Sequence, residues 1–217
     1  MQIENLIEHT ALGPQTTKAQ IENLCIQAKE HQFKAVCIPP YYIQTAKLFL
    51  KKTEILVCTV IGYPYGYSST VAKAEEVKKA ILDGADELDV LINICAVKNQ
   101  DWSYVSNDIE SVTMAAHMKG KIVKIIIETG LMNEEEIKKI CEICIEKEAD
   151  YVKTSSGVNG DGASVEVVKL IKEIVGEKAK IKASGGIRNF EKAKQLIEAG
   201  ADRLGASKSI DIINQVK

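Results

Sequence analysis

Short apolar segments alternate with longer amphipathic segments along the whole chain. The short segments are nearly continuous runs of apolar residues, which is typical of strands buried on both faces. In the longer segments apolar residues recur every three or four positions, as on one face of a helix. The pattern predicts strands at 6–10, 33–38, 55–61, 86–94, 121–128, 150–154, 179–184 and 202–206. It predicts helices at 17–30, 41–51, 69–83, 104–118, 133–147, 164–175 and 190–199.

Boundary signals support this division. An Ala-Asp pair follows a Gly or Glu at 84–86, 148–150 and 200–202, where a helix should end and Asp should open the next strand. Thr16, Thr17 and Asn133 stand where helices should begin, and their side chains are good N-caps. Eight strands alternating with helices favour a closed (β/α)8 barrel, the TIM barrel, over an open doubly wound sheet. With no linker-like segment, residues 1–217 are predicted to form a single α/β domain.

Charged residues fall on one side of four consecutive predicted strands. Alternate residues of a barrel strand face the axis, and the residues between them face the helices. The aliphatic side must pack under the helices, so the charged side is predicted to point into the barrel. Charge at this density in an interior predicts an active site. The residues concerned are Glu87 and Asp89, Lys124 and Glu128, Lys153, and Lys180 and Lys182.

Two of these residues, Lys153 and Lys182, end their strands before turns rich in serine and glycine. A nucleophilic amine must be neutral, so a site that uses one has to lower the lysine pKa from its usual value of about 10.4. A second ammonium roughly 6 Å away, at an effective dielectric of about 20, contributes about 2.8 kcal/mol, or about two pKa units. The alternative is that each lysine forms a structural ion pair with an interior carboxylate such as Asp89 or Glu128.

Asp89 is the carboxylate that the alternation places best for proton transfer. Schiff-base chemistry needs a proton donor and acceptor beside the amine and the adjacent carbon. Asp89 lies near the end of its strand and faces the predicted interior. This role is compatible with an ion pair to a lysine.

Glycine-containing segments follow the last two predicted strands, at 184–188 and 205–207. Barrels often bind phosphate at this position through backbone N–H groups at the start of a helix. A Gly-Gly pair alone also occurs in plain turns, and Arg188 can equally face solvent on the following helix. The residues expected around a phosphate are Gly185, Gly186, Gly205 and Ser207.

With these segments in place, the chain resembles the deoxyribose-phosphate aldolases, which are class I, Schiff-base aldolases. The resemblance runs through nearly the whole chain, from residues 7–12 to 205–207. Its most specific segments are 152–157 (Val-Lys-Thr-Ser-Ser-Gly), 182–188 (Lys-Ala-Ser-Gly-Gly-Ile-Arg) and 85–90 (Ala-Asp-Glu-Leu-Asp-Val). Segments 35–38, 60–64 and 126–130 also fit the family pattern.

The resemblance implies that Lys153 forms the Schiff base, Lys182 perturbs it, and Asp89 transfers protons with a water. It implies reversible cleavage of 2-deoxy-D-ribose 5-phosphate to D-glyceraldehyde 3-phosphate and acetaldehyde, without a metal or cofactor. It also adds Thr10 and Ser156 to the expected substrate-binding residues.

The chain departs from the family pattern in several places. Glu8 replaces the usual Asp, which questions its contact with the substrate or the second lysine. Ser156 replaces a Thr and keeps the hydroxyl, and Lys208 replaces a Ser found in some members. The chain ends at Lys217, without the tyrosine-bearing tail of some members. We expect these differences to tune affinity and rate.

Composition narrows the partners and the location. Twenty-eight Lys and Arg against 30 Asp and Glu provide no long-range attraction to nucleic acid or anionic membranes. No apolar run approaches the length of a membrane span, so a cytoplasmic location is expected. The six scattered cysteines are typical of reduced, buried thiols. Cys141 and Cys144 share a helical stripe, which favours a core role over a redox or metal site.

Two other functions stay open from the residues alone. One is a Schiff-base barrel aldolase for a different phosphorylated sugar, and the other is a phosphate-binding barrel without catalysis. Because barrels of the family that the chain resembles often form dimers, a homodimer is expected, although the sequence does not indicate an interface.

Overall fold

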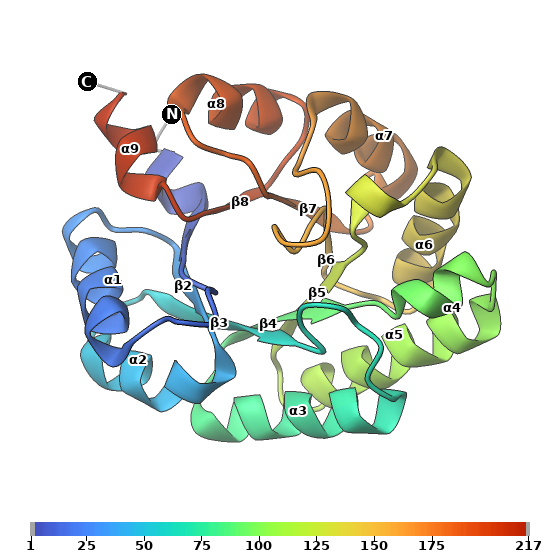
Figure 1. The fold of residues 1–217 in the computed structure, drawn as a ribbon, viewed down its shortest axis with the longest axis horizontal. Coiled ribbons are helices and arrows are strands. Elements are labelled where there is room, and N and C mark those ends of the chain that lie inside the picture. Colours follow the sequence, from blue (N-terminus) through green and yellow to red (C-terminus); the bar gives the residue numbers. More distant parts are fainter. Residues whose placement is uncertain (1–2, 216–217) are drawn as a thin grey trace.

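The computed structural model describes residues 3–215, and its strands close into a barrel (Figure 1). Each strand is parallel to the next along the chain, and the last strand pairs with the first, so the predicted (β/α)8 barrel is confirmed. The strands are β1 (Ile7–Thr10), β2 (Ala35–Ile38), β3 (Leu56–Ile61), β4 (Glu87–Leu91), β5 (Ile122–Ile126), β6 (Tyr151–Lys153), β7 (Lys180–Ser184) and β8 (Arg203–Ala206).

Helices surround the barrel (Figure 1). Those that the sequence predicted are α1 (Lys18–Glu30), α2 (Ile43–Phe49), α3 (Thr70–Asp83), α5 (Trp102–His117), α6 (Glu134–Glu146), α7 (Val165–Val175) and α8 (Phe190–Glu198). The pattern missed α4 (Ile94–Lys98), α9 (Ser209–Asn214) and the 3-10 turns η1 (Ile3–Leu6), η2 (Pro40–Tyr42) and η3 (Thr129–Leu131). These elements are too short for a repeat of 3.6 residues to become visible.

The N-caps at the predicted positions are present. Thr17 caps α1 together with Gln20, and Asn133 caps α6 together with Glu136, each pair forming a capping box. Each box supplies partners to N–H groups that a helix start leaves unpaired. Thr16 lies outside the helix, so of the two threonines Thr17 is the cap.

The aspartates that precede β4, β6 and β8 link neighbouring strands. Each carboxylate accepts a hydrogen bond from a backbone N–H near the start of the preceding strand. The pairs are Asp86 with Val57 (3.0 Å), Asp150 with Val123 (2.9 Å) and Asp202 with Ile181 (2.8 Å). The repeated Ala-Asp of the sequence therefore marks a contact between strands at the N-terminal end of the barrel.

Aliphatic side chains of the strands pack beneath the helices, while charged side chains occupy the barrel interior. The interior position predicted from the alternation is confirmed for Glu87, Asp89, Lys124, Lys153 and Lys182, all of which are buried. The prediction was wrong for two further residues. The strand ends at Ile126, so Glu128 lies beyond it in a turn, and Lys180 is exposed at the opposite end of the barrel.

Cys141 and Cys144 lie in the hydrophobic core on α6, as the helical stripe predicted. Burial raises the pKa of Cys141 to about 12, which keeps its thiol protonated. No helix within residues 3–215 is long and apolar enough to cross a membrane. That residues 1–217 form a single domain stays a prediction.

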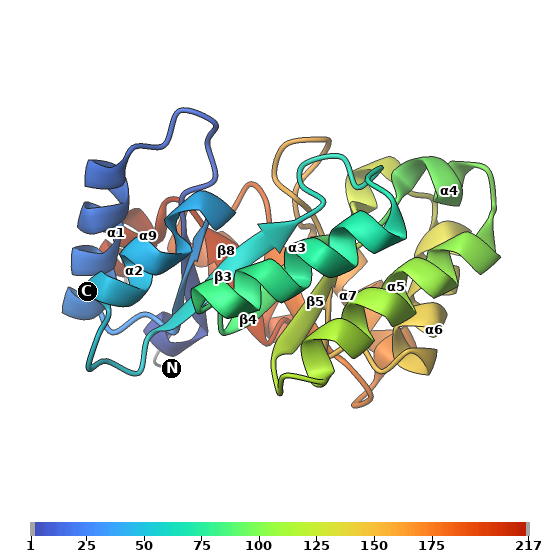
Figure 2. The ribbon, with the colours of Figure 1, turned by 90° about the horizontal axis from the view of Figure 1, so that it is seen from below.

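The loops after β1 and β3 rise on one side of the barrel, and the N-terminal end of the chain lies on the other side (Figure 2). The raised side is formed by the C-terminal ends of the parallel strands. Active sites of barrel enzymes lie at this end, where loops from different strands come together.

Candidate active site

A network of buried ion pairs fills the barrel interior below the C-terminal ends of the strands. Six strands supply its charged groups from inward-facing positions: β4 contributes two, and β1, β5, β6, β7 and β8 contribute one each. Its carboxylates are Glu8, Glu87 and Asp89, and its cations are Lys124, Lys153, Lys182 and Arg203. The described part of the network thus has one more basic group than it has carboxylates.

Asp89 is the centre of this network. Its Oδ2 accepts hydrogen bonds from the Nζ atoms of Lys153 at 2.7 Å and Lys182 at 2.6 Å. Its Oδ1 accepts one from Lys124 Nζ at 3.0 Å. Burial alone would raise the pKa of Asp89, but the three ammonium groups hold it well below its ordinary value. Asp89 is therefore ionised in the folded protein at neutral pH.

Lys182 has a second carboxylate partner, Glu8 Oε2. Burial works to lower the pKa of Lys182, yet Asp89 and Glu8 together raise it above the ordinary value. Lys182 therefore stays positively charged beside Lys153. The contact also answers the question raised by the first strand, because the longer Glu8 side chain does reach the second lysine.

Lys153 pairs with one carboxylate, Asp89, whereas Lys182 pairs with two. The ion pair that was the alternative to catalysis is thus present for both lysines, through Asp89 and not through Glu128. An ion pair and a reactive amine are compatible, since a lysine can release its proton when the surrounding charge favours the neutral form.

The cleft above the two lysines measures ≈ 570 Å³, which falls within the roughly 300–1,000 Å³ of small-molecule sites. Lys153 and Lys182 line it. All six residues expected to bind substrate or phosphate also line it, namely Thr10, Ser156, Gly185, Gly186, Gly205 and Ser207. Arg188 lines the cleft as well, whereas the exposed Lys208 pairs with Asp211 at 3.9 Å.

Two glycine positions in the cleft have specific structural reasons. Gly186 has φ +73°, in the left-handed region that glycine adopts readily. Gly205 leaves room for a neighbour, because a Cβ atom there would lie 3.1 Å from Cε of Lys182. Glycine on β8 therefore allows the Lys182 side chain to extend along the barrel interior toward Asp89.

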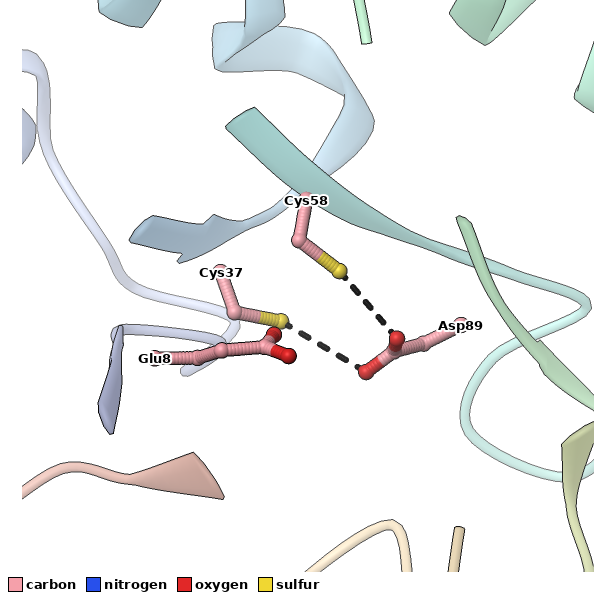
Figure 3. Close-up of side chains that lie close together, drawn as sticks. All are labelled: Glu8, Cys37, Cys58 and Asp89. Carbon is pink, nitrogen blue, oxygen red and sulfur yellow. Dashed lines mark hydrogen bonds between the residues drawn. The ribbon is translucent and has the colours of Figure 1, made fainter. Parts of the chain in front are cut away.

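Two thiols lie against Asp89 from the neighbouring strands β2 and β3 (Figure 3). Cys58 Sγ donates to Asp89 Oδ1 at 3.1 Å, and Cys37 Sγ lies 3.9 Å from Oδ2. Ligand atoms of these three residues and Glu8 lie within 4.8 Å of one another, a spacing that a metal ion could use. The carboxylate oxygens, however, already accept from ammonium groups, so a cation would have to displace the lysines. The donor set fits an ion-paired site better than a metal centre.

Four members of the network were not among the site residues predicted from the sequence, namely Glu8, Glu87, Lys124 and Arg203. Alternation had placed Lys124 and Glu87 inside the barrel, but it could not indicate which atoms they meet. Arg203 contacts both Glu8 and Glu87 at 3.3 Å across the interior. Arg203 opens β8, and its charge in an otherwise apolar strand is the signal that could have identified it.

The fold and site together define a (β/α)8 barrel with two buried lysines at the base of a cleft. Residues 7–211 match the DeoC/LacD family of aldolases. A deoxyribose-phosphate aldolase of Staphylococcus epidermidis is 50% identical over 208 residues, covering 96% of this chain and 94% of the relative. One of Finegoldia magna is 48% identical over 213 residues, covering 98% and 99%. The tetrameric deoxyribose phosphate aldolase of Aeropyrum pernix has a TM-score of 0.92 and 27% identity, covering 99% and 90%.

The chain therefore belongs to the DeoC/LacD family of aldolases. It is an enzyme of the carbon–carbon lyase type, as the resemblance of its motifs had implied.

Proposed function

We propose that this aldolase reversibly cleaves 2-deoxy-D-ribose 5-phosphate to D-glyceraldehyde 3-phosphate and acetaldehyde through a Schiff base on Lys153. The observation that supports this most directly is the placement of Lys153, which lines the cleft and whose Nζ donates to Asp89 Oδ2 at 2.7 Å. The substrate follows from relatives that cover nearly the whole chain and are deoxyribose-phosphate aldolases.

The charge balance of the network favours Lys153 as the amine that becomes neutral. The described network has four basic groups against three carboxylates, so loss of one proton leaves it without net charge. Lys182 is held as a cation by Asp89 and Glu8, and Lys124 contacts all three carboxylates. Lys153 has one carboxylate partner and lines the cleft, so its neutral form costs least and can meet substrate.

The chemical steps follow from that arrangement. Neutral Lys153 attacks the C1 aldehyde of the sugar and forms a carbinolamine, which loses water to give the protonated imine. The C3 hydroxyl then loses its proton while the C2–C3 bond breaks, and the bonding electrons move toward the iminium nitrogen. This step releases D-glyceraldehyde 3-phosphate and leaves an enamine. Protonation at carbon and hydrolysis then release acetaldehyde and regenerate the amine.

Asp89 serves the proton transfers in this proposal, acting with a water molecule. It contacts both lysines, and its carboxylate is ionised, so it can accept a proton from the carbinolamine stage and return one later. Lys182 contributes a fixed positive charge that disfavours a second cation at Lys153.

The phosphate is proposed to lie at the glycine-rich rim of the same cleft. Backbone N–H groups of Gly185, Gly186 and Gly205 and the hydroxyl of Ser207 are the donors that we assign to it. Thr10 and Ser156, which line the same cleft, are assigned to the sugar hydroxyl groups.

One experiment tests both the amine and the reaction class. The protein is incubated with acetaldehyde, reduced with borohydride and digested, and the adduct is mapped by mass spectrometry. We expect one stable adduct, on Lys153. A folded protein that gives no adduct would contradict the proposal, and Lys153→Met is the control that should remain unlabelled.

Substrate identity needs a separate measurement. Release of glyceraldehyde 3-phosphate from 2-deoxy-D-ribose 5-phosphate is expected for the wild-type protein. An adduct on Lys153 together with cleavage only of another phosphorylated sugar would retain the chemistry and reject the substrate. A protein that forms no adduct and cleaves no sugar would be a barrel without catalysis.

Assembly and location are proposals at a coarser level. The Aeropyrum pernix relative is described as tetrameric, which makes self-association a reasonable expectation for this chain. A homodimer is our prediction, and sedimentation at several protein concentrations tests it. We also expect this enzyme to act in the cytoplasm on small molecules, without nucleic-acid or membrane partners.

A further inference from the structure

Another buried carboxylate, Glu128, lies outside the ion-pair network and contacts Ser156, which lines the cleft. It follows β5 and is fully buried, yet both of its oxygens accept from uncharged donors. Its backbone has φ 52° and ψ 58°, the left-handed conformation that non-glycine residues rarely adopt. Strained positions of this kind persist where the surrounding contacts hold them, often at functional sites.

Both oxygens of Glu128 bind the loop between β6 and α7, residues 154–164. The backbone N–H of Ser156 donates to Oε1 at 2.9 Å, and Asn159 Nδ2 donates to Oε2 at 3.3 Å. Asn159 Nδ2 also donates to the carbonyl oxygen of Pro64, in the loop after β3. Glu128 and Asn159 therefore join the loops that follow β3, β5 and β6.

The position of Ser156 is fixed by these contacts. Its carbonyl oxygen accepts from the hydroxyl of Tyr63 at 3.3 Å, and its Oγ accepts from the backbone N–H of Val158 at 3.1 Å. With Oγ used as an acceptor, the Ser156 hydroxyl hydrogen is left to donate toward the cleft that the residue lines. The contact from Glu128 to the Ser156 N–H completes this arrangement.

The same loop rests directly on the glycine-rich rim. The N–H of Ala163 donates to the carbonyl oxygens of Ser184 at 3.0 Å and Gly185 at 3.1 Å. A Cβ atom on Gly162 would lie 2.1 Å from the Gly185 oxygen, so the two backbones are in close contact. A shift of the β6–α7 loop would therefore disturb both Ser156 and the proposed phosphate site.

We propose that Glu128 is a positioning residue that holds the β6–α7 loop over the cleft and thereby sets the affinity for the phosphorylated substrate. A carboxylate suits this role because it presents two acceptors to two donors, whereas a glutamine offers one acceptor and one donor. The part of the inference that concerns substrate affinity rests on the proposed function, whereas the loop contact does not.

Kinetics of Glu128→Gly and Glu128→Gln test the effect on affinity. Glycine removes the carboxylate but adopts the left-handed backbone without strain, so it separates the side chain from the conformation. For 2-deoxy-D-ribose 5-phosphate we expect KM to rise about tenfold in Glu128→Gly and less in Glu128→Gln, with a smaller change in kcat. Adduct formation by acetaldehyde on Lys153 should proceed as in the wild type, because acetaldehyde is too small to need the loop.

Asn159→Ala is the second variant, on a partly exposed residue that is less able to affect folding. It should raise KM in the same direction. If both residues act through one set of contacts, the double variant Glu128→Gln/Asn159→Ala should raise KM by less than the product of the single effects. If KM in the double variant rises by the full product of the single effects, Asn159 and Glu128 act independently, which would contradict a shared set of contacts.

Hydrogen exchange of residues 154–164 tests the loop contact without reference to any substrate. Exchange should be faster in each variant than in the wild type, while exchange in α1 and α5 stays unchanged. Unchanged exchange with unchanged KM would overturn the proposal. So would an equal loss of kcat, adduct formation and melting temperature, which would indicate a general folding defect. A wild-type protein that fails to cleave the sugar would reject the proposed substrate, and the exchange result would still decide the loop contact.

Discussion

Lys153 and Lys182 occupy paired positions on β6 and β7 and donate to the same oxygen atom, Oδ2 of Asp89. Because both Nζ atoms touch one atom, they lie closer together than the roughly 6 Å assumed from the sequence, and their repulsion is correspondingly larger. When both lysines are charged, the negative charge of Asp89 offsets part of this repulsion. The arrangement ties the charge of one lysine to that of the other.

The first prediction concerns Lys182→Met. Removal of the neighbouring ammonium should make the Lys153 ammonium easier to retain, so the acid limb of the pH–rate profile should move to higher pH, by about two units. Lys182→Arg should leave the limb closer to its wild-type position because it keeps the charge. Lys180→Met is the matched control, since Lys180 lies on the same strand but is exposed. An unmoved limb in Lys182→Met would mean that Lys182 does not control the amine.

The second prediction concerns Asp89→Asn. The change leaves Lys124, Lys153 and Lys182 without their shared carboxylate, which should lower the free energy of unfolding by about 3–5 kcal/mol at pH 7. We expect kcat to fall by about 10²–10⁴, because proton transfer is lost. Denaturant unfolding and steady-state assays measure the two effects. A variant with normal kcat would remove Asp89 from the proton-transfer role.

Acid should reveal the same carboxylate through stability. The folded-state pKa of Asp89 lies well below the ordinary value of 3.8, so its contribution is fully present above about pH 4 and is lost as pH falls toward the folded-state pKa. The difference in unfolding free energy between wild type and Asp89→Asn should therefore shrink below pH 4. Urea titrations of both proteins at about pH 7, 4 and 3 measure this difference in unfolding free energy. A constant difference would contradict the shift.

The next prediction concerns Gly205→Ala. The added Cβ would lie 3.1 Å from Lys182 Cε and 3.1 Å from Ser184 Cβ, which is tighter than ordinary packing. We expect kcat/KM to fall about tenfold as Lys182 moves away from Asp89. In a Lys182→Ala background, Gly205→Ala should have a smaller further effect, because the Cε atom that the new Cβ meets is gone and only the contact with Ser184 Cβ remains. A full additional loss there would place the effect elsewhere.

The last prediction concerns Asp202→Ala, at the opposite end of the barrel. Loss of the hydrogen bond to the Ile181 N–H should cost about 1–2 kcal/mol of unfolding free energy and leave kcat unchanged. Asp211→Ala, which removes a carboxylate from an exposed pair, should cost less than about 0.5 kcal/mol. A loss of activity without loss of stability in Asp202→Ala would contradict this assignment.

Much of the fold could be predicted because buried parallel strands leave a strong signal. Segments such as 55–61 and 121–128 read as apolar runs, and the observed strands β3 and β5 lie within them. The error at Glu128 arose because one more apolar residue, Ile127, follows the strand, and its N–H still donates to the Lys153 carbonyl oxygen at 2.9 Å. Alternation was extended past Ile126, where the backbone turns into a left-handed conformation.

The site was predictable as a set of side chains and not as a set of contacts. Alternation gives the face of a strand, so Asp89, Lys153 and Lys182 could be placed in one interior. It gives no information on stagger between strands or on side-chain reach. Those two properties bring Glu8 to Lys182 across the pairing of β1 with β8, and Arg203 to Glu87 across the barrel.

The aspartates Asp86, Asp150 and Asp202 fix strand starts at the end of the barrel remote from the cleft. Register and chemistry are consequently specified at opposite ends of the molecule. An engineer could therefore exchange the loops around the cleft to change the accepted aldehyde while leaving these three anchors in place. For the same reason, mutations in the loops around the cleft can change the substrate while the contacts of the three aspartates keep the barrel folded.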